Sequence, residues 1–330
     1  MAAHIIDGRE LAAELKRHLG AQVRRLSEQG TRPGLATVIA GDDYPSVAYE
    51  RRVRRLAEEL GCHYVCAALS SDVSEADVIA EVGKLDADPR VHGILVLRPL
   101  PADVAEAAVY RALDPLKDIE AVHPVNAGLL ALGRPRYVPS TPASVFHMLD
   151  RYLSSTSDDP AAVYARSNLV VVGRSSNVGK PAMLLAQARN ATVVSCDVHS
   201  SRAGLLVGHT RAADILVVAA GVPELIGAEH VKEGAVVIDV GINPVSQEGT
   251  GKVRLVGDVD FNAVAEKAAA ISPVPGGVGP ITDVWLLRNT VWAARLAASV
   301  QAAQPSWEGL SVPGDLGAAG LVAAPASSSA

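Results

Sequence analysis

Two glycines and the polar residues between them form the stretch of this sequence best suited to chemistry. Gly173 follows an apolar, β-branched run at 169–172, and Gly179 opens a helical stretch. Strand, glycine turn, helix and a second strand at 191–196 form the unit that places a dinucleotide's pyrophosphate at a helix N-terminus. The spacing is G-x5-G rather than G-x-G-x-x-G, so an ordinary strand–helix–strand connection stays open as an alternative.

Two charged residues beside this turn bear on the choice of cofactor. Arg174 follows Gly173, where a guanidinium suits the 2′-phosphate of NADP, although it could also be a solvated turn residue. Asp197 directly follows the second strand, where a carboxylate suits the ribose hydroxyls of NAD. We predict NADP as the cofactor, with NAD as the alternative.

The composition indicates a globular protein rather than a nucleic-acid or membrane binder. The 330 residues are enough for two domains, and 49% hydrophobic with 20% charged residues is ordinary for a globular chain. A net charge of -6 gives no reason to expect nucleic acid or an anionic membrane as a partner. No apolar run is long enough to cross a bilayer, and the N-terminus lacks the layout of a signal peptide. We expect a cytoplasmic protein.

The cysteines and histidines do not suggest a metal site. Cys62, Cys66 and Cys196 lack zinc spacing, and the nine histidines form no H-x-x-x-H cluster. Free thiols in a reducing compartment are the expected state of the cysteines.

The elements that position these residues alternate between helix and strand. In the first half, we predict helices at 7–30, at 45–61 and after Ser74, and strands at 35–40, 62–69 and 93–96. In the second helix, the residues that share one face are Tyr49, Val53, Leu56 and Leu60. Residues 117–128 are expected to be a loop.

The second half predicts a parallel sheet followed by a last helix. Thr141 and Pro142 suit a helix start, with the helix running to about 152, and 154–160 is the most linker-like stretch. Strands at 215–219 and 236–239 both end at glycines. No regular element is expected in 272–280, which is rich in glycine and proline. The last helix is predicted at 281–303, and the tail at 304–330 is expected to be disordered.

Several motifs, in matching order over residues 1–300, together resemble one family. They are KDIEAVHPVN, PSTP, VVVGRSSNVGKP, AAGVPELI, VIDVGIN, VGDVDF and the most specific, PVPGGVGP. The chain resembles methylenetetrahydrofolate dehydrogenase/cyclohydrolases. This resemblance implies an α/β protein with two domains flanking a cleft. We expect a folate domain at 1–150 joined by the helix 281–303, a Rossmann-like NAD(P) domain at 151–280, and a homodimer.

The resemblance also implies roles for individual residues. Tyr49 stacks on the ring system of a tetrahydrofolate derivative, the substrate. The other residues expected to bind this substrate are Val96, Arg98, Pro275, Gly276, Gly277 and Gly279. Those expected to bind the cofactor are Gly173, Arg174, Ser175, Ser200 and Ile242.

Three active-site positions depart from the family pattern. In the family motif Y-x-x-x-K the lysine is central to the cyclohydrolase step, and here the position is Val53. The supporting glutamine of V-Q-L-P-L-P is Leu97, and the aspartate of D-x-D-G is Glu120, followed by Ala121. A shifted register is an alternative, but Arg52 and Arg54 point about 100° to either side of position 53 on a helix.

The departures affect the two family reactions differently. Oxidising 5,10-methylenetetrahydrofolate to the methenyl cation moves a hydride and needs no proton transfer. Hydrolysing that cation to 10-formyltetrahydrofolate needs water and a positioned polar group, which valine is not. We therefore predict a dehydrogenase of one-carbon metabolism with weak or lost cyclohydrolase activity.

Alternatives to these roles remain at this stage. Val53 fits the apolar stripe and could be core, as could Tyr49. Asp283 could cap the last helix or touch a ligand, and capping is our expectation. A repurposed paralogue that reduces a non-folate imine or iminium compound, or a non-catalytic ligand-binding protein, is the second functional hypothesis.

Overall fold

The computed structural model describes residues 3–246 and 253–302, which divide into two compact units. The three-stranded unit comprises residues 10–140 together with the C-terminal helix from residue 280. The six-stranded unit comprises residues 3–9 and the described part of 141–279. We expected residues 3–9 and 141–150 to belong to the folate domain. In the structure they belong to the six-stranded unit. The tail at 304–330 lies outside the described residues.

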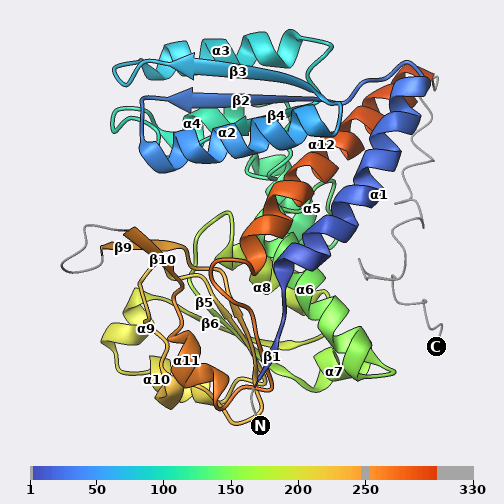
Figure 1. Ribbon diagram of the computed structural model, residues 1–330. Coiled ribbons are helices and arrows are strands. Elements are labelled where there is room, and N and C mark those ends of the chain that lie inside the picture. Colours follow the sequence, from blue (N-terminus) through green and yellow to red (C-terminus); the bar gives the residue numbers. More distant parts are fainter. Residues whose placement is uncertain (1–2, 247–252, 303–330) are drawn as a thin grey trace, which may run out of the picture. The chain divides into compact units, whose positions relative to one another are not determined.

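The three-stranded unit is a parallel sheet in the order β3-β2-β4. Its strands are β2 (Gly34–Ala40), β3 (His63–Leu69) and β4 (Gly93–Val96). Its helices are α1 (Gly8–Glu28), α2 (Tyr44–Glu59), α3 (Glu75–Ala87), α4 (Glu106–Ala112), α5 (Pro124–Ala131) and most of α12 (Val278–Ala302). Figure 1 shows α2 and α3 on opposite sides of the strands.

Helices on both sides explain why β2 is buried along its length and apolar at every position except Thr37. All seven residues of β2 are buried. Ala36 and Val38 pack with Val78 and Val82 of α3, because alternate strand residues point to the same face. A parallel strand covered on both faces requires a continuous apolar run rather than alternation.

The six-stranded unit is a parallel, doubly wound sheet in the order β1-β11-β8-β7-β5-β6. Its strands are β1 (His4–Ile5), β5 (Asn168–Val172), β6 (Thr192–Cys196), β7 (Ile215–Val218), β8 (Val236–Asp239) and β11 (Ala270–Ile271). The chain order reverses between β5 and β7, and ligands of such sheets bind outside the strand ends at that switch point. The predicted α/β class with a Rossmann-like second part is confirmed.

Short helices and one hairpin complete this unit. The α-helices are α6 (Ser140–Thr156), α7 (Pro160–Arg166), α8 (Gly179–Gln187), α9 (Val198–Arg202), α10 (Leu206–Arg211) and α11 (Phe261–Ala265), and Ala228–His230 forms a 3-10 turn. Strands β9 (Asn243–Ser246) and β10 (Val253–Val256) pair antiparallel.

Four local predictions from the sequence are wrong. Helix α6 starts at Ser140, so Thr141 lies inside it rather than capping it, and α6 and α7 absorb most of the expected linker at 154–160. Helix α5 occupies part of the expected loop at 117–128, because Pro124 is tolerated in a first helical turn after His123 caps it. A proline in the first helical turn is likewise tolerated in α12, which begins at Val278. This start lies inside the segment 272–280, for which no regular element was expected.

Candidate functional site

The glycine turn after β5 closes tightly against the neighbouring strand end. Gly173 has φ +118°, and a Cβ there would lie 2.1 Å from the carbonyl oxygen of Ala219, the residue after β7. A Cβ on Gly179 would lie 2.0 Å from the carbonyl oxygen of Gly173. The Gly179 N–H donates to Ser175 Oγ at 3.3 Å. Only glycine fits both positions, so these two residues allow the turn before α8 to pack closely against the end of β7.

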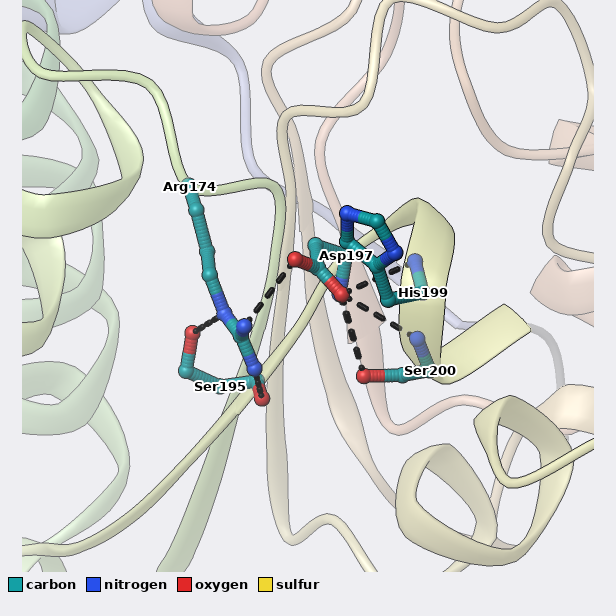
Figure 2. Close-up of polar contacts among 5 residues, drawn as sticks. All are labelled: Arg174, Ser195, Asp197, His199 and Ser200. Atoms are coloured by element: carbon teal, nitrogen blue, oxygen red, sulfur yellow. Dashed lines mark hydrogen bonds and ion pairs between the residues drawn. The ribbon is translucent and has the colours of Figure 1, made fainter. Parts of the chain in front are cut away.

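Arg174 extends from this turn to the end of β6, where it meets Asp197 (Figure 2). Its Nη1 donates to Asp197 Oδ2 at 2.9 Å, and its Nε and Nη2 donate to the hydroxyl and carbonyl oxygens of Ser195 at 2.9 and 2.7 Å. In the sequence, Arg174 favoured NADP and Asp197 favoured NAD, and in the structure these two residues form an ion pair.

The second carboxylate oxygen of Asp197 caps α9. It accepts hydrogen bonds from the backbone N–H groups of His199 and Ser200 at 3.0 and 3.1 Å. The bond from Ser200 is the main cause that lowers the pKa of Asp197, with Arg174 contributing. Ser200, a predicted cofactor residue, therefore lies beside Arg174 and Asp197 as part of the same network.

Two buried aspartates hold the loops that follow β7 and β8. Asp258 accepts hydrogen bonds from the N–H groups of Ala220 and Gly221 at 2.6 and 2.9 Å. Asp239 accepts from the N–H groups of Gly241 and Asp258 at 2.9 and 3.0 Å. Burial raises the pKa of Asp239 to about 7. Sequence reasoning missed both carboxylates, although VIDVGIN and VGDVDF contain them.

The predicted residues Ile242 and Gly279 are neighbours at this end of the six-stranded unit. Ile242 is 57% exposed, unusual for isoleucine, and its Cδ1 would lie 3.7 Å from a Cβ at Gly279. In the same loop Gly276 accepts a hydrogen bond from the Gly8 N–H at 2.9 Å, and a Cβ on Gly8 would lie 1.7 Å from the carbonyl oxygen of Gly277. Pro275 precedes these glycines. The segment from Pro275 to Gly279 is thus held by close backbone contacts.

In the three-stranded unit, the position predicted to correspond to the family lysine is part of the core. Val53 is 0% exposed and Leu97 is 5% exposed. The buried stripe of α2 consists of Ser46, Glu50, Val53 and Ala57, and Tyr49 lies at its margin. The buried Glu50 carboxylate accepts from Arg54 and Tyr64, so no carboxylate of this stripe is free to pair with a lysine at 53.

Tyr49 lies in a charged cluster instead. The guanidinium carbon of Arg52 is 4.9 Å from the centre of the Tyr49 ring, and Arg52 Nε donates to Asp283 Oδ2 at 2.6 Å. Burial, and then the charges of Asp283 and Glu120, raise the pKa of Tyr49, so its hydroxyl stays protonated. Asp283 lies inside α12 and pairs with Arg52, so the expectation that it caps this helix is wrong. The Arg52–Asp283 pair was missed because these residues are far apart in sequence.

Glu120 is half-buried, and its charge acts on Tyr49. One of its oxygens accepts a hydrogen bond from the Ser140 N–H at 3.1 Å, and burial raises its pKa to about 7. Ala121, where the family has glycine, has φ +51°. Val96 and Arg98 lie at the end of β4, and the Arg98 carbonyl oxygen accepts from Ser46 Oγ of α2 at 2.7 Å.

Within 3–246 and 253–302, no group of three or more His, Cys, Asp or Glu residues is placed to hold a metal ion. In the same residues, no helix has the length and apolar character needed to cross a membrane.

The architecture and motifs agree with comparisons to known proteins. The catalytic-domain model of tetrahydrofolate dehydrogenase/cyclohydrolases matches residues 6–120, and the model of their NAD(P)-binding domain matches 139–298. The protein "Bifunctional protein FolD 3" of Rubrobacter xylanophilus is 63% identical over 300 residues, covering 91% of this chain and 94% of that protein.

Solved structures agree as well. The methylenetetrahydrofolate dehydrogenase-cyclohydrolase of Trypanosoma brucei, complexed with NADP and an inhibitor, has a TM-score of 0.83 and 35% identity, covering 90% of this chain and 99% of that one. A 5,10-methylenetetrahydrofolate dehydrogenase from the silkworm Bombyx mori has a TM-score of 0.80 and 37% identity, with the same coverage. Because the family models match most of both units, and the glycine turn lies at the switch point of the matched NAD(P)-binding domain, this chain belongs to the tetrahydrofolate dehydrogenase/cyclohydrolase family.

Proposed function

We propose that this chain oxidises 5,10-methylenetetrahydrofolate to 5,10-methenyltetrahydrofolate with NADP, and that its cyclohydrolase activity is weak or lost. The observation that carries the second part is Val53, which is 0% exposed at the position of the family lysine. A fully buried valine cannot donate, accept or transfer a proton.

The described residues fit a dinucleotide. In the turn from Gly173 to Gly179, glycine occupies the two positions where a Cβ would collide with the backbone. The N–H groups of this turn can therefore approach a pyrophosphate before α8. Gly173, Arg174 and Ser175 are the residues we assign to the phosphates, and Ile242 is the one we assign to the nicotinamide. Ser200 is a further residue that we assign to the cofactor. When bound, the cofactor supplies the hydride acceptor.

For the substrate, we assign Tyr49 to the folate rings and Glu120 to the pterin. Val96, Arg98 and the segment from Pro275 to Gly279 are assigned to its borders. Hydride transfer requires these residues only to orient the substrate, since no proton leaves in that step. The addition of water to the methenyl cation requires a side chain that can transfer a proton, and neither valine at 53 nor leucine at 97 can do so.

The test follows both reactions in one cuvette with purified protein. We expect reduced NADP to accumulate with methylenetetrahydrofolate, and the methenyl product to decay no faster than in buffer. No reduction of NADP or NAD would contradict the dehydrogenase. Decay of the methenyl absorbance well above the buffer rate would contradict the loss of cyclohydrolase.

One observation favours the second hypothesis, a rebuilt substrate site. The Arg52 guanidinium lies over the Tyr49 ring, which covers one of the two faces on which a folate ring could stack. A paralogue that reduces another imine or iminium compound would consume reduced cofactor with such compounds and leave methylenetetrahydrofolate unchanged. The same cuvette assay, run with cyclic imines, separates the two hypotheses.

We also propose a homodimer and a cytoplasmic location, both on the family resemblance. Light scattering should give twice the monomer mass of 34.2 kDa, and a monomer mass would contradict the dimer. Fractionation of the source cells should recover the protein with cytoplasmic markers.

A further inference from the structure

One buried carboxylate, that of Asp258, joins two loops at the carboxyl end of the six-stranded sheet. Its Oδ2 accepts hydrogen bonds from the N–H groups of Ala220 and Gly221, in the loop after β7, at 2.6 and 2.9 Å. Its Oδ1 accepts a hydrogen bond from Asn243 Nδ2 at 2.8 Å, and Asn243 directly follows Ile242 in the chain after β8. Asp258 is 0% exposed, so these bonds are shielded from water. The two oxygens of one side chain therefore set the spacing of the two loops.

A second carboxylate, that of Asp239, holds Asp258 in place. Asp239 Oδ1 accepts hydrogen bonds from the N–H groups of Gly241 and Asp258 at 2.9 and 3.0 Å. Its Oδ2 accepts a hydrogen bond from the Val259 N–H at 3.0 Å. A buried carboxylate is costly unless hydrogen bonds satisfy its oxygens, and these backbone donors supply such bonds. Asp258 is thus fixed through its own backbone as well as through its side chain.

The chain packs on the two carboxylates so closely that a side chain would not fit. A Cβ on Gly241 would lie 2.2 Å from Asp258 Oδ1, and a Cβ on Gly257 would lie 1.8 Å from Asp239 Oδ2. Neither glycine has a φ in the left-handed region, so the space rather than the backbone conformation requires glycine there. The path of the chain at these two glycines therefore follows the two carboxylates.

The loop after β7 also touches the glycine turn before α8. A Cβ on Gly173 would lie 2.1 Å from the carbonyl oxygen of Ala219. Contacts thus run from the turn that we assign to the pyrophosphate, through the loop after β7, to Asp258, Asn243 and the neighbouring Ile242, which we assign to the nicotinamide. Because pyrophosphate and nicotinamide are joined covalently within the cofactor, these two parts of the protein must be held at a matching separation.

We propose that Asp258 is a positioning residue for hydride transfer, which holds the loop carrying Ile242 at the separation from the pyrophosphate turn that the cofactor requires. The proposal rests on the proposed function, since it concerns the cofactor site of that reaction. Asp258 acts through Asn243 and through the N–H groups of the loop after β7. Without the bond between Asn243 and Asp258, the nicotinamide end of the cofactor loses its fixed position. The adenosine end, which we assign to Arg174, keeps its own contacts.

The test breaks this bond from its less buried side. Asn243→Ala removes the amide that donates to Asp258, and Asn262→Ala is the matched control because Asn262 is exposed in α11 of the same unit. We expect Asn243→Ala to lower kcat about tenfold, the effect of losing one hydrogen bond to a charged group. Its KM for methylenetetrahydrofolate should stay within about twofold, and Asn262→Ala should match wild type throughout.

Titration without substrate separates a positioning role from general damage to the site. NADP carries both ends of the cofactor, whereas adenosine 2′,5′-bisphosphate ends before the nicotinamide. We expect Asn243→Ala to bind NADP about three- to tenfold more weakly than wild type does, and the bisphosphate with unchanged affinity. If wild type binds NAD more tightly than NADP, NAD and ADP take their places. An equal loss of affinity for both ligands, or unchanged NADP affinity together with unchanged kcat, would overturn the proposal.

A second variant tests whether the two residues act through one bond. Asp258→Asn keeps the shape of the side chain but turns one of its two acceptors into a donor. Combined with Asn243→Ala, it completes a double-mutant cycle in kcat and in NADP affinity. The double variant should lose less than the product of the two single losses. Losses that simply multiply would mean that Asn243 and Asp258 act separately, and the proposal would fail.

The titrations also let this proposal and the proposed function fail separately. If no protein oxidises methylenetetrahydrofolate, but Asn243→Ala loses affinity for NADP and not for the bisphosphate, the dehydrogenase fails and Asp258 still positions the cofactor. If wild type oxidises methylenetetrahydrofolate, and Asn243→Ala keeps its kcat and both affinities, the role of Asp258 fails and the dehydrogenase stands.

Discussion

Replacing Asp197 with asparagine should raise the preference for NADP over NAD about tenfold. In the structure, Asp197 pairs with Arg174, the residue assigned to the 2′-phosphate. The carboxylate therefore competes with that phosphate for the guanidinium and also repels it. Asparagine has the same shape and caps helices as well as aspartate does, so α9 should keep its N-cap.

The magnitude follows from the position of the two charges. Arg174 Nη1 lies 2.9 Å from Asp197 Oδ2, so a phosphate on another edge of the same guanidinium would lie about 5 Å from the carboxylate. The Arg174 side chain is 45% exposed, so the dielectric constant is close to that of water. By Coulomb's law at this separation in water, the repulsion between the carboxylate and a phosphate of nearly two charges corresponds to about a tenfold change in affinity.

Calorimetric titration of wild type and Asp197→Asn with each cofactor measures this preference. We expect wild type to bind NADP more tightly than NAD, and the variant to gain affinity for NADP with little change for NAD. Higher salt should shrink the gain because it screens exposed charges. The reasoning is refuted if the ratio of the two affinities is unchanged, or if it moves toward NAD.

Three further predictions concern the three-stranded unit. Val53→Lys alone should lower the free energy of unfolding in urea by about 3 kcal/mol or more, since it buries an unpaired ammonium. The double change Val53→Lys with Leu97→Gln should recover more hydrolysis of the methenyl compound than the two single changes together. A rate of hydrolysis equal to the sum of the two single variants would argue against a paired function. Ala121→Gly should stabilise the protein by about 0.5–1 kcal/mol in the same experiment, because φ +51° strains alanine and not glycine, and a loss of stability would mean that the buried methyl group matters more. Burial raises the pKa of Glu120 from 4.5 to about 7, so the folded state holds the carboxyl proton more tightly than the unfolded state does. As pH rises from 4.5 to 7, the free energy of unfolding of wild type should therefore fall by on the order of 2 kcal/mol relative to that of Glu120→Gln. Asp239, whose pKa is also raised, titrates in both proteins and cancels, so a flat difference between the two over this pH window would contradict the raised pKa of Glu120.

Much of the sheet structure could be predicted because its signals are local. The strands 93–96 and 236–239 coincide with β4 and β8 residue for residue, since each is a short apolar run bounded by loop residues. The N-cap of α3 at Ser74 is confirmed, with its Oγ accepting from the Asp77 N–H. Strands of two residues, such as β1 and β11, have no periodicity to detect and were not predicted.

The candidate site was less accessible to sequence reasoning because its contacts join distant segments. Arg52 and Asp283 come from α2 and α12, and no local pattern pairs them. The same holds for Asp258, whose partners Ala220 and Gly221 follow a different strand. The family motifs indicated which positions matter, whereas the roles assigned to Tyr49 and the other site residues stay predictions.

The pairing of β1 with β11 has a consequence for the order of synthesis. His4 and Ile5 leave the ribosome long before Ala270 and Ile271, which are their partners in the sheet. At about 5–20 residues per second, the first strand waits on the order of tens of seconds for its neighbour. The edge of the six-stranded sheet therefore closes only after β11 has been made. A chain interrupted before β11 would carry an unpaired N-terminal strand, free to join the sheet edge of another nascent chain.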